Sequence, residues 1–316
     1  MGIVYEALSH PLPKSFREWY PYDKPETYPD NSDHPWLRGM QRVTADALPG
    51  LKHTFLVARD DAVGRYVGVC WLCESTATPE LAHFGWFLVE EAYRGRGIGA
   101  QILDRAIARL QSHGVEMIML PTLLSTKLAR GMYARRGFRD TIIEKSTGRC
   151  WMVRAKPGHH ERYFSRAGDI ECGAFVPADY IAFDYLLCRP KSESRLYSLG
   201  VVGTKRIVSF KQTWEGQTMV AARVGGRLVG IAAANEAEND IVEFDAFALR
   251  REVLDALFSY ALQTFERPVR CHVARSDTQK RATVEAAGFR LIGHDEAKGP
   301  DDEVVAMDVF LHEPVN

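Results

Sequence analysis

The chain has 316 residues, with 40 Lys and Arg against 41 Asp and Glu, so its formal net charge is -1. Hydrophobic residues make up 46% and charged residues 26%, which excludes a disordered or fibrous protein. At roughly 150 residues per domain, this length predicts two domains. A net charge near zero supplies no general attraction for nucleic acid or membranes, so we expect neither as a partner, and any anion site must be local.

The apolar runs and the cysteines indicate a cytoplasmic protein. No apolar run reaches the roughly 18 residues of a membrane span, and residues 1–6 lack the features of an export signal. The six cysteines are scattered and form no disulfide framework. Cys70 and Cys73 have CxxC spacing but lie in a predicted buried strand, where residues three apart point to opposite faces. We therefore expect reduced thiols and no metal site.

The first half of the chain alternates strands and helices after a Pro-rich and aromatic segment. That segment, about fifty residues long, predicts loops with one or two short helices. Further along, period-two and helical apolar patterns follow each other. The predicted elements are strands over 54–59, 66–73 and 83–89, a helix that follows residues 94–99 and ends at Gly114, a strand over 117–120, a helix over 125–136, and strands near 141–144 and 150–153.

The second half repeats this order of elements. Its predicted elements are strands over 218–224, 228–233 and 241–248, a helix whose apolar face spans 253–265, a strand over 269–273 and a helix that ends at Gly288. The turn-forming residues 156–158 mark the break between the halves, and the second begins by about Ile170. The sequence therefore predicts two copies of one unit, over residues 1–158 and 165–316.

A glycine-rich stretch, Arg94-Gly-Arg-Gly-Ile-Gly99, lies directly between a predicted strand and an amphipathic helix. Glycines let a loop backbone approach a ligand closely, and the first N–H groups of a helix attract an anion. The stretch therefore predicts a phosphate cradle. It fits neither the dinucleotide fingerprint nor the P-loop, because its spacing is Arg-x-x-Gly-x-Gly.

This spacing resembles that of the GCN5-related N-acetyltransferase (GNAT) family, whose loop holds the pyrophosphate of acetyl-CoA. A second match supports it: Tyr133-x-x-x-Gly137-Phe138 ends the next predicted helix. The resemblance implies an α/β (α+β) fold of two tandem units, each a mixed, mostly antiparallel central sheet flanked by helices. It also implies that residues 1–158 are the catalytic domain with the CoA-binding loop, and that 165–316 form a degenerate unit with a structural or substrate-side role.

The resemblance assigns a set of residues to acetyl-CoA, the co-substrate. A backbone N–H near the end of the strand before the loop would stabilise the oxyanion. Thr126 stands where the family commonly carries an Asn and would hydrogen-bond the pantetheine amide. The CoA-binding residues are thus expected to be Leu88, Val89, Arg94, Gly95, Arg96, Gly97, Ile98, Gly99, Ala100 and Thr126.

Tyr133 and His83 are the expected catalytic residues. A tyrosine with a reference pKa of about 10 stays protonated and can give its proton to the departing thiolate. His83 lies eleven residues before Arg94, where several GNAT enzymes carry a base, and a reference pKa of about 6.5 suits that task. A packing role remains the alternative for each. Glu74, Glu90 and Glu91 are rival bases, and many GNAT enzymes need no dedicated base.

The predicted activity is that of an acyltransferase: direct transfer of an acetyl group from acetyl-CoA to a small-molecule amine in a ternary complex. Aromatic residues would wall the acceptor pocket or serve only as core: Trp19, Tyr20, Trp36 and Trp86. The alternatives are a protein or peptide acetyltransferase, a non-catalytic CoA-binding sensor or scaffold, and an acyl-CoA decarboxylase. The oligomeric state is expected to be monomer or homodimer.

The second unit is predicted to be unable to bind CoA. At its loop position, residues 247–254 contain no glycine, and the helix begins almost directly after the strand. Val284 stands four residues before Gly288, as Tyr133 stands four before Gly137, and valine has no proton to give. Arg250 and Arg251 are expected to be solvated residues at the start of the helix.

Overall fold

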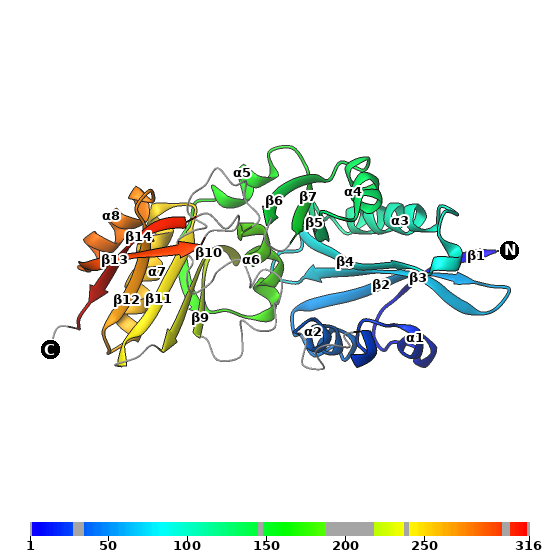
Figure 1. The fold of residues 1–316 in the computed structure, drawn as a ribbon, viewed down its shortest axis with the longest axis horizontal. Coiled ribbons are helices and arrows are strands. Elements are labelled where there is room, and N and C mark those ends of the chain that lie inside the picture. Colours follow the sequence, from blue (N-terminus) through cyan, green and yellow to red (C-terminus); the bar gives the residue numbers. More distant parts are fainter. Residues whose placement is uncertain are drawn as a thin grey trace.

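The computed structural model describes residues 2–27, 35–144, 148–187, 218–236, 240–298 and 304–314. They form two seven-stranded sheets, each with helices on its faces (Figure 1). The strand order is β1-β2-β3-β4-β5-β7-β6 in the first sheet and β13-β14-β12-β11-β10-β9-β8 in the second. Neighbouring strands are antiparallel except β4 with β5 and β11 with β12, which are parallel. The predicted fold of two tandem, mostly antiparallel units is confirmed.

The first unit contains the strands of the first sheet and the helices beside it. Its elements are β1 (Ile3–Leu8), α1 (Lys14–Trp19), η1 (Pro25–Thr27), α2 (Pro35–Thr44), β2 (Leu51–Asp60), β3 (Arg65–Ser75), β4 (Leu81–Val89), η2 (Glu91–Tyr93), α3 (Ile98–Ser112), β5 (Met117–Leu123), α4 (Lys127–Ala134), β6 (Arg139–Glu144) and β7 (Arg149–Ala155). β1 was not predicted; it joins the sheet by pairing antiparallel with β2.

The second unit repeats this pattern after a short helical connection. Its elements are α5 (His159–Phe164), β8 (Ile170–Ala174), η3 (Pro177–Asp179), α6 (Tyr180–Leu187), β9 (Thr218–Val224), β10 (Arg227–Glu236), β11 (Val242–Ala248), α7 (Arg251–Thr264), β12 (Val269–Ala274), α8 (Thr278–Ala286), β13 (Arg290–Lys298) and β14 (Val304–His312). Among the described residues, no helix is long and apolar enough to cross a membrane.

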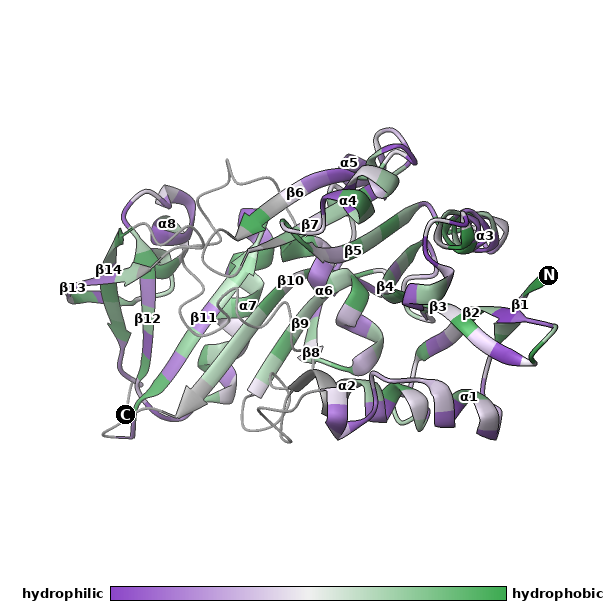
Figure 2. Cartoon of the chain, turned by 45° about the vertical axis from the view of Figure 1, so that its right-hand side comes forward, coloured by the Kyte–Doolittle hydropathy of each residue, from purple (hydrophilic) through white to green (hydrophobic). Residues whose placement is uncertain are grey.

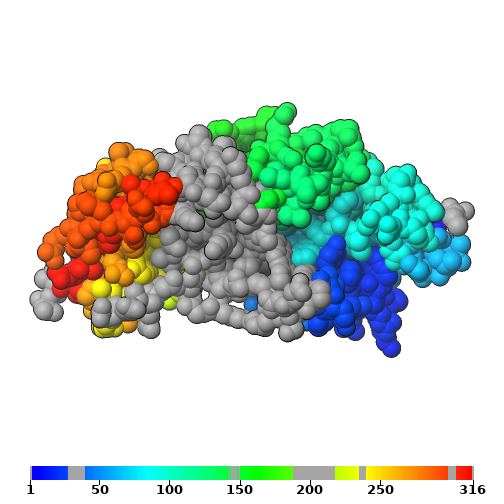
Figure 3. Space-filling view, in the orientation of Figure 1, coloured from blue at the N-terminus to red at the C-terminus, as the bar shows by residue number. Residues whose placement is uncertain are grey.

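Helices cover both faces of the first sheet. α3 and α4 lie on one face and α1 and α2 on the other, and α6 lies between the two sheets (Figures 1 and 2). In the space-filling view, the segment with α1 and α2 (blue) lies beneath the strands and helices of its own unit (cyan and green) (Figure 3). Side chains from α1, α6, β3, β4, β9 and β10 fill one continuous core, here called the shared core.

The cysteines follow the predicted strand geometry. Cys73 lies in the shared core, whereas Cys70 lies in the core under α3, on the opposite face of β3. The five cysteines in the described part of the chain are free thiols, and Cys188 lies outside that part. In the same part, no group of three or more His, Cys, Asp or Glu side chains could hold a metal ion.

β4 and β5 separate after only three paired residues. Leu81 to His83 pair with Met117 to Met119, but β4 continues to Val89 and β5 to Leu123. We call the space between the diverging ends the β4–β5 wedge. It lies directly before the glycine-rich loop.

A β-bulge in β4 sets which side chains face each side of the first sheet. The register with β3 shifts between Val69 and Trp71, and Trp86 has a φ of 50°. The extra residue reverses the order in which successive side chains of β4 point to the two faces of the sheet. As a result, Ala82, Phe84, Phe87 and Val89 face α3, whereas Leu81, His83, Trp86 and Leu88 face the shared core.

Candidate active site

The loop between β4 and α3 has an open backbone. Gly95 and Gly97 have φ values of 76° and 78°, which side chains other than glycine rarely adopt. A Cβ at either position would meet no heavy atom within 4 Å. Gly97 is the N-cap of the 15-residue helix α3, and no side chain caps that terminus. The first N–H groups of the helix are therefore available to an anion, as the pyrophosphate cradle requires.

Gly99 has a different task. A Cβ there would lie 3.2 Å from the Phe87 ring and 3.5 Å from Val89. The missing side chain lets α3 pack closely on β4, so Gly99 fixes the helix rather than opening the cradle. Ile98 is buried in the core beneath it and offers only its backbone to a ligand.

Two arginines carry positive charge on the exposed surface of the loop. Arg94 Nε donates to the backbone oxygen of Val89 at 3.1 Å, which ties the loop to the end of β4. Arg96 lies over the ring of Tyr93, 5.0 Å from its centroid, and the Tyr93 hydroxyl donates to Asp60 at 2.9 Å. The arginines thus place two positive charges on the loop that precedes α3, as the predicted anion cradle requires.

Leu88 and Val89, at the end of β4, differ in the direction of their backbone N–H groups. The N–H of Glu90 donates to the oxygen of Val67 at 2.9 Å, and Leu88 is paired with Val69. Because an antiparallel strand alternates the direction of its backbone groups, Leu88 also bonds to β3, whereas the N–H of Val89 points away from β3 toward the β4–β5 wedge. Of the two predicted oxyanion residues, the geometry favours Val89.

Tyr133 lies on α4 in the core on the α3 side of the first sheet. It is 5% exposed, and its ring centroid is 5.9 Å from that of Phe84 and 6.0 Å from that of Phe138. Burial raises the pKa of Tyr133 well above its usual value, and Cys70 and Tyr22 raise it further. The phenol therefore keeps its proton at neutral pH.

Thr126 is the N-cap of α4, at the end of β5. Its hydroxyl donates to the backbone oxygen of Leu123 at 2.6 Å and lies 2.9 Å from the hydroxyl of Thr122. Since its proton is already used, Thr126 can only accept a hydrogen bond from a pantetheine amide.

His83 lies in the shared core, at the last paired residue before the β4–β5 wedge opens. Its ring centroid is 5.4 Å from Trp71, 6.0 Å from Trp151 and 5.9 Å from Tyr180. Within the described part of the chain, neither ring nitrogen has a hydrogen-bond partner. Burial lowers the pKa of His83 to about 3, so the isolated imidazole is neutral and a weak base.

Two of the three rival bases, Glu74 and Glu90, already have partners, and the third is exposed. Glu74 lies 2.8 Å from His113 Nδ1. Glu90 accepts from the indole of Trp19 at 2.8 Å and pairs with Arg65. Glu91 is exposed in η2.

The structure adds a residue that the sequence did not single out. The ring of Tyr22 packs on Trp86, with 4.9 Å between the ring centroids. Burial raises the pKa of Tyr22 and the nearby charge of Arg94 offsets part of that rise, while Tyr22 in turn contributes to the raised pKa of Tyr133. Tyr22 therefore lies at the edge of the shared core, between Trp86 of β4 and Arg94 of the loop. A lone tyrosine in a segment with no periodic pattern carries no signal for this position.

The aromatic residues that were predicted to line the acceptor pocket lie in different surroundings. Tyr20 is fully buried and stacks on Phe16 at 5.2 Å, so it is part of the core. Trp19 and Trp86 are half-buried at the rim of the shared core. The side chain of Trp36 lies outside the described residues.

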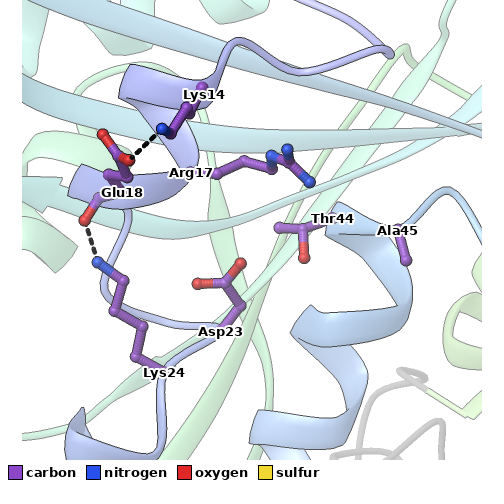
Figure 4. A pocket seen from close by; sticks show the side chains of 7 residues that line it. All are labelled: Lys14, Arg17, Glu18, Asp23, Lys24, Thr44 and Ala45. Carbon is purple, nitrogen blue, oxygen red and sulfur yellow. Dashed lines mark hydrogen bonds and ion pairs between the residues drawn. The ribbon is translucent and has the colours of Figure 1, made fainter.

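A hollow with a volume of about 570 Å³ lies between α1 and α2 (Figure 4). Arg17, Asp23 and Thr44 point into it, and Lys14 and Lys24 contact Glu18 at its edge. Small-molecule pockets are mostly apolar with a few polar groups, and this lining is nearly all charged or polar. We therefore do not place the acceptor there.

The second unit lacks an equivalent cradle. Only Leu249 and Arg250 separate β11 from α7, and Val284 is fully buried. Arg250 donates to the backbone oxygen of Arg166 at 3.0 Å and pairs with Glu252, and Arg251 pairs with Asp255. Between β11 and α8, Asp245 and Lys280 form a buried ion pair.

Comparison with protein families supports the resemblance seen in the sequence. Residues 14–138 match the family described as "Acetyltransferase (GNAT) family". The first unit therefore contains a GNAT acetyltransferase domain, whose family uses acetyl-CoA as the acyl donor. No curated protein matches the chain significantly.

Solved structures of acetyltransferases are similar to about half of the chain. An acetyltransferase of the GNAT family from Staphylococcus aureus is 18% identical, covers 48% of this chain and 99% of its own, and has a TM-score of 0.36. ElaA from Escherichia coli is 19% identical, covers 48% and 99%, and has a TM-score of 0.38. An IAA acetyltransferase from Bacillus cereus is 18% identical, covers 49% and 100%, and has a TM-score of 0.35.

Proposed function

We propose that the protein is an acetyl-CoA-dependent N-acetyltransferase that acts on a small-molecule amine. The observation that carries this proposal is the open cradle of Gly95 and Gly97 at the uncapped start of α3, beside the β4–β5 wedge. The residues fit the co-substrate, because the open Cβ space admits a phosphate to the backbone and Arg94 and Arg96 supply charge.

In this proposal each residue has one task. Acetyl-CoA supplies the acyl group, and Gly95, Arg96, Gly97 and the N–H groups of Ile98, Gly99 and Ala100 hold its pyrophosphate. The N–H of Val89 offers a hydrogen bond to a developing oxyanion. Tyr133 holds a proton at its hydroxyl that a thiolate leaving group can take. His83 is the candidate that receives the proton of the amine.

The face of β3 and β4 that carries His83 is covered by other elements, and this supports a small acceptor. α1, α6 and the side chains of β10 pack over the face of β3 and β4 that carries His83. A peptide acceptor would need an open groove along this face. The half-buried rings of Tyr22 and Trp86 remain at its rim and suit an apolar or cationic amine.

The two units would then have different roles. Residues 1–158 would form the catalytic domain, and residues 165–316 a degenerate unit that closes the acceptor side. The support is the presence of the cradle in the first unit and the buried pair Asp245–Lys280 in the second.

An assay of the purified full chain tests this function. The protein is incubated with acetyl-CoA and a panel of amines that includes polyamines, aromatic amines, amino acids and peptides, while free thiol is followed. We expect amine-dependent thiol release with a small amine. Malonyl-CoA is added in a separate arm, because release of carbon dioxide without an amine would indicate a decarboxylase. CoA binding with no thiol release in any arm would indicate a sensor or scaffold.

A further inference from the structure

A cavity of about 670 Å³ lies at the end of the first sheet that is remote from the glycine-rich loop. β1 pairs with β2 only along residues 55–60, so within the described part of the chain no strand covers residues 51–54 at that edge. We call this space the β2-edge cavity. Arg109, in its lining, follows Ile98 by eleven residues, or about 16 Å along α3, so the cavity is separate from the cradle at the start of that helix.

His53 brings a buried hydrogen-bond donor to the lining of the β2-edge cavity. Its side chain is 4% exposed, and the indole N–H of Trp71 donates to His53 Nδ1 at 3.2 Å. Burial lowers the pKa of His53 to about 4, so the ring is neutral at pH 7 and carries its proton on Nε2. Among the described residues, this N–H has no hydrogen-bond partner. A buried donor without an acceptor is unfavourable, so His53 needs an acceptor from outside the chain.

Two further nitrogens of the lining are buried and have no hydrogen-bond partner in the part of the chain that the structure describes: His10 Nε2 and Arg109 Nε. The ring of His10 lies edge to face with that of His53, with 6.4 Å between the centroids. Arg109 comes from the last turn of α3, and the exposed Lys52 adds a second positive charge to the lining. Unpartnered nitrogens from three separate elements therefore meet at one cavity.

Two carboxylates also line the cavity, but they do not supply the missing acceptors. Glu74 lies 2.8 Å from His113 Nδ1. Asp46 is exposed, so solvent and salt screen its charge, although it is close enough to His53 to oppose part of the lowering of its pKa. The nitrogens of His53 and Arg109 thus still lack an acceptor.

We propose that the β2-edge cavity is a second ligand site, which binds the oxyanion group of a small molecule, a carboxylate or a phosphate, between His53, Arg109 and Lys52. The oxygens of one such group would accept from Nε2–H of His53 and from the guanidinium of Arg109. The charges of Arg109 and Lys52 would compensate that of the anion. This inference goes beyond the proposed acetyl transfer and does not depend on it, because the site shares no residue with the CoA-binding loop or with Tyr133.

Occupation of the site should be visible at Trp71. Its indole N–H bonds to the imidazole that would hold the ligand, and its ring lies 5.4 Å from that of His83. Because hydrogen bonds in a chain polarise one another, an acceptor at Nε2 of His53 makes Nδ1 a stronger acceptor for the indole. The indole N–H signal of Trp71 should therefore move downfield when the ligand binds.

Calorimetry on the full chain tests the proposal, with inorganic phosphate in one arm and succinate in the other. CoA is kept in excess, so that the glycine-rich loop does not compete for the probe. We expect one of the probes to bind at one site per chain, and the arm that binds tells phosphate from carboxylate. Arg109→Gln should weaken this binding roughly tenfold or more, and Lys52→Gln should weaken it by less. Arg105→Gln is the control: Arg105 lies one turn earlier on α3, over the ring of Tyr5, and its loss should leave the affinity unchanged.

The assigned indole N–H signal of Trp71 in NMR spectra gives the second readout. It should move on addition of the probe to the unmodified chain and to Arg105→Gln, and should move less in Arg109→Gln or, where that variant does not fold, in Lys52→Gln. These signals report on the cavity whether or not the chain binds CoA or acetylates an amine, so the two proposals can fail separately. If neither probe binds, if the variants bind as well as the control, or if the Trp71 signal stays in place, the cavity holds only water and the proposal is overturned.

Discussion

Lys280 and Asp245 form an ion pair in which each side chain is only 2% exposed. Asp245 lies on β11 and Lys280 on α8, which correspond to β4 and α4 of the first unit. Lys280 is three residues after the N-cap Asp277, and Ala129 is three residues after the N-cap Thr126. A small side chain in one unit is thus replaced by a long, charged one in the other. The Asp245–Lys280 pair therefore lies in the second unit at the position that corresponds to the β4–β5 wedge of the first unit.

The chain should therefore bind one acetyl-CoA. The second unit has no glycine loop, and binding there would have to break a buried ion pair, which costs about 3–5 kcal/mol when one partner is left alone. Isothermal titration calorimetry should give a stoichiometry of one per chain. Two equivalent sites would show that the second unit also binds the co-substrate.

Gly97→Val should weaken the binding of acetyl-CoA at least tenfold, or about 1.4 kcal/mol. The side chain would fill the open space at the cradle and strain a φ of 78°. Gly64→Val is a matched control: Gly64 has a φ of 67° and open space around it, but lies in the turn between β2 and β3. It should show the same loss of stability with unchanged affinity. Equal affinities in both variants would exclude the loop as the CoA site.

Tyr133→Phe should lower turnover by roughly ten- to a thousandfold and leave the affinity for acetyl-CoA nearly intact. The reason is the loss of the phenolic proton that the proposed function assigns to the leaving thiolate, while the Phe ring keeps the packing against Phe84 and Phe138. Tyr163→Phe serves for comparison, since Tyr163 is also buried but lies in the shared core. Its turnover should match the unmodified enzyme. Turnover that is equal in both variants would make Tyr133 a packing residue.

Acid should destabilise the first unit through two buried histidines. Burial lowers the pKa of His53 to about 4 and that of His83 to about 3, from an ordinary 6.5. Between pH 6.5 and 4 the unfolded chain binds these protons and the folded chain does not, so stability falls as pH falls. Each histidine contributes about 1.4 kcal/mol per pH unit. Urea unfolding at several pH values should show this slope, and His53→Asn should reduce it; an unchanged slope would contradict the assignment.

The sequence predicted the order of elements in both units because their signals are local. Apolar spacing defines α3, and a left-handed glycine precedes it at Gly97. β1 was missed because its burial does not alternate strictly and its pairing partner β2 lies more than forty residues away. Its place in the sheet depends on a non-local contact.

The site was predictable only in part. The glycine-rich loop and the helix that carries Tyr133 were predicted from spacing, and the role of Tyr133 stays a prediction from the resemblance. The β-bulge at Trp86, which puts His83 and Trp86 on one face, has no signal in the sequence. The role of Gly99 required the distance to Phe87. Tyr180 packs against His83 from a helix about a hundred residues further along the chain, and nothing in the sequence of that helix indicates this contact.

The shared core determines how the protein unfolds. Trp71, Trp151, Tyr180 and Ile231 come from both units but pack in one core, without a layer of solvent between two separate ones. Neither half can unfold without exposing the apolar face of the other, so denaturation should be a single cooperative transition. A fragment that ends at residue 158 would leave that face open to water and should aggregate. Shortening the protein to its GNAT domain is therefore the wrong way to make a minimal enzyme.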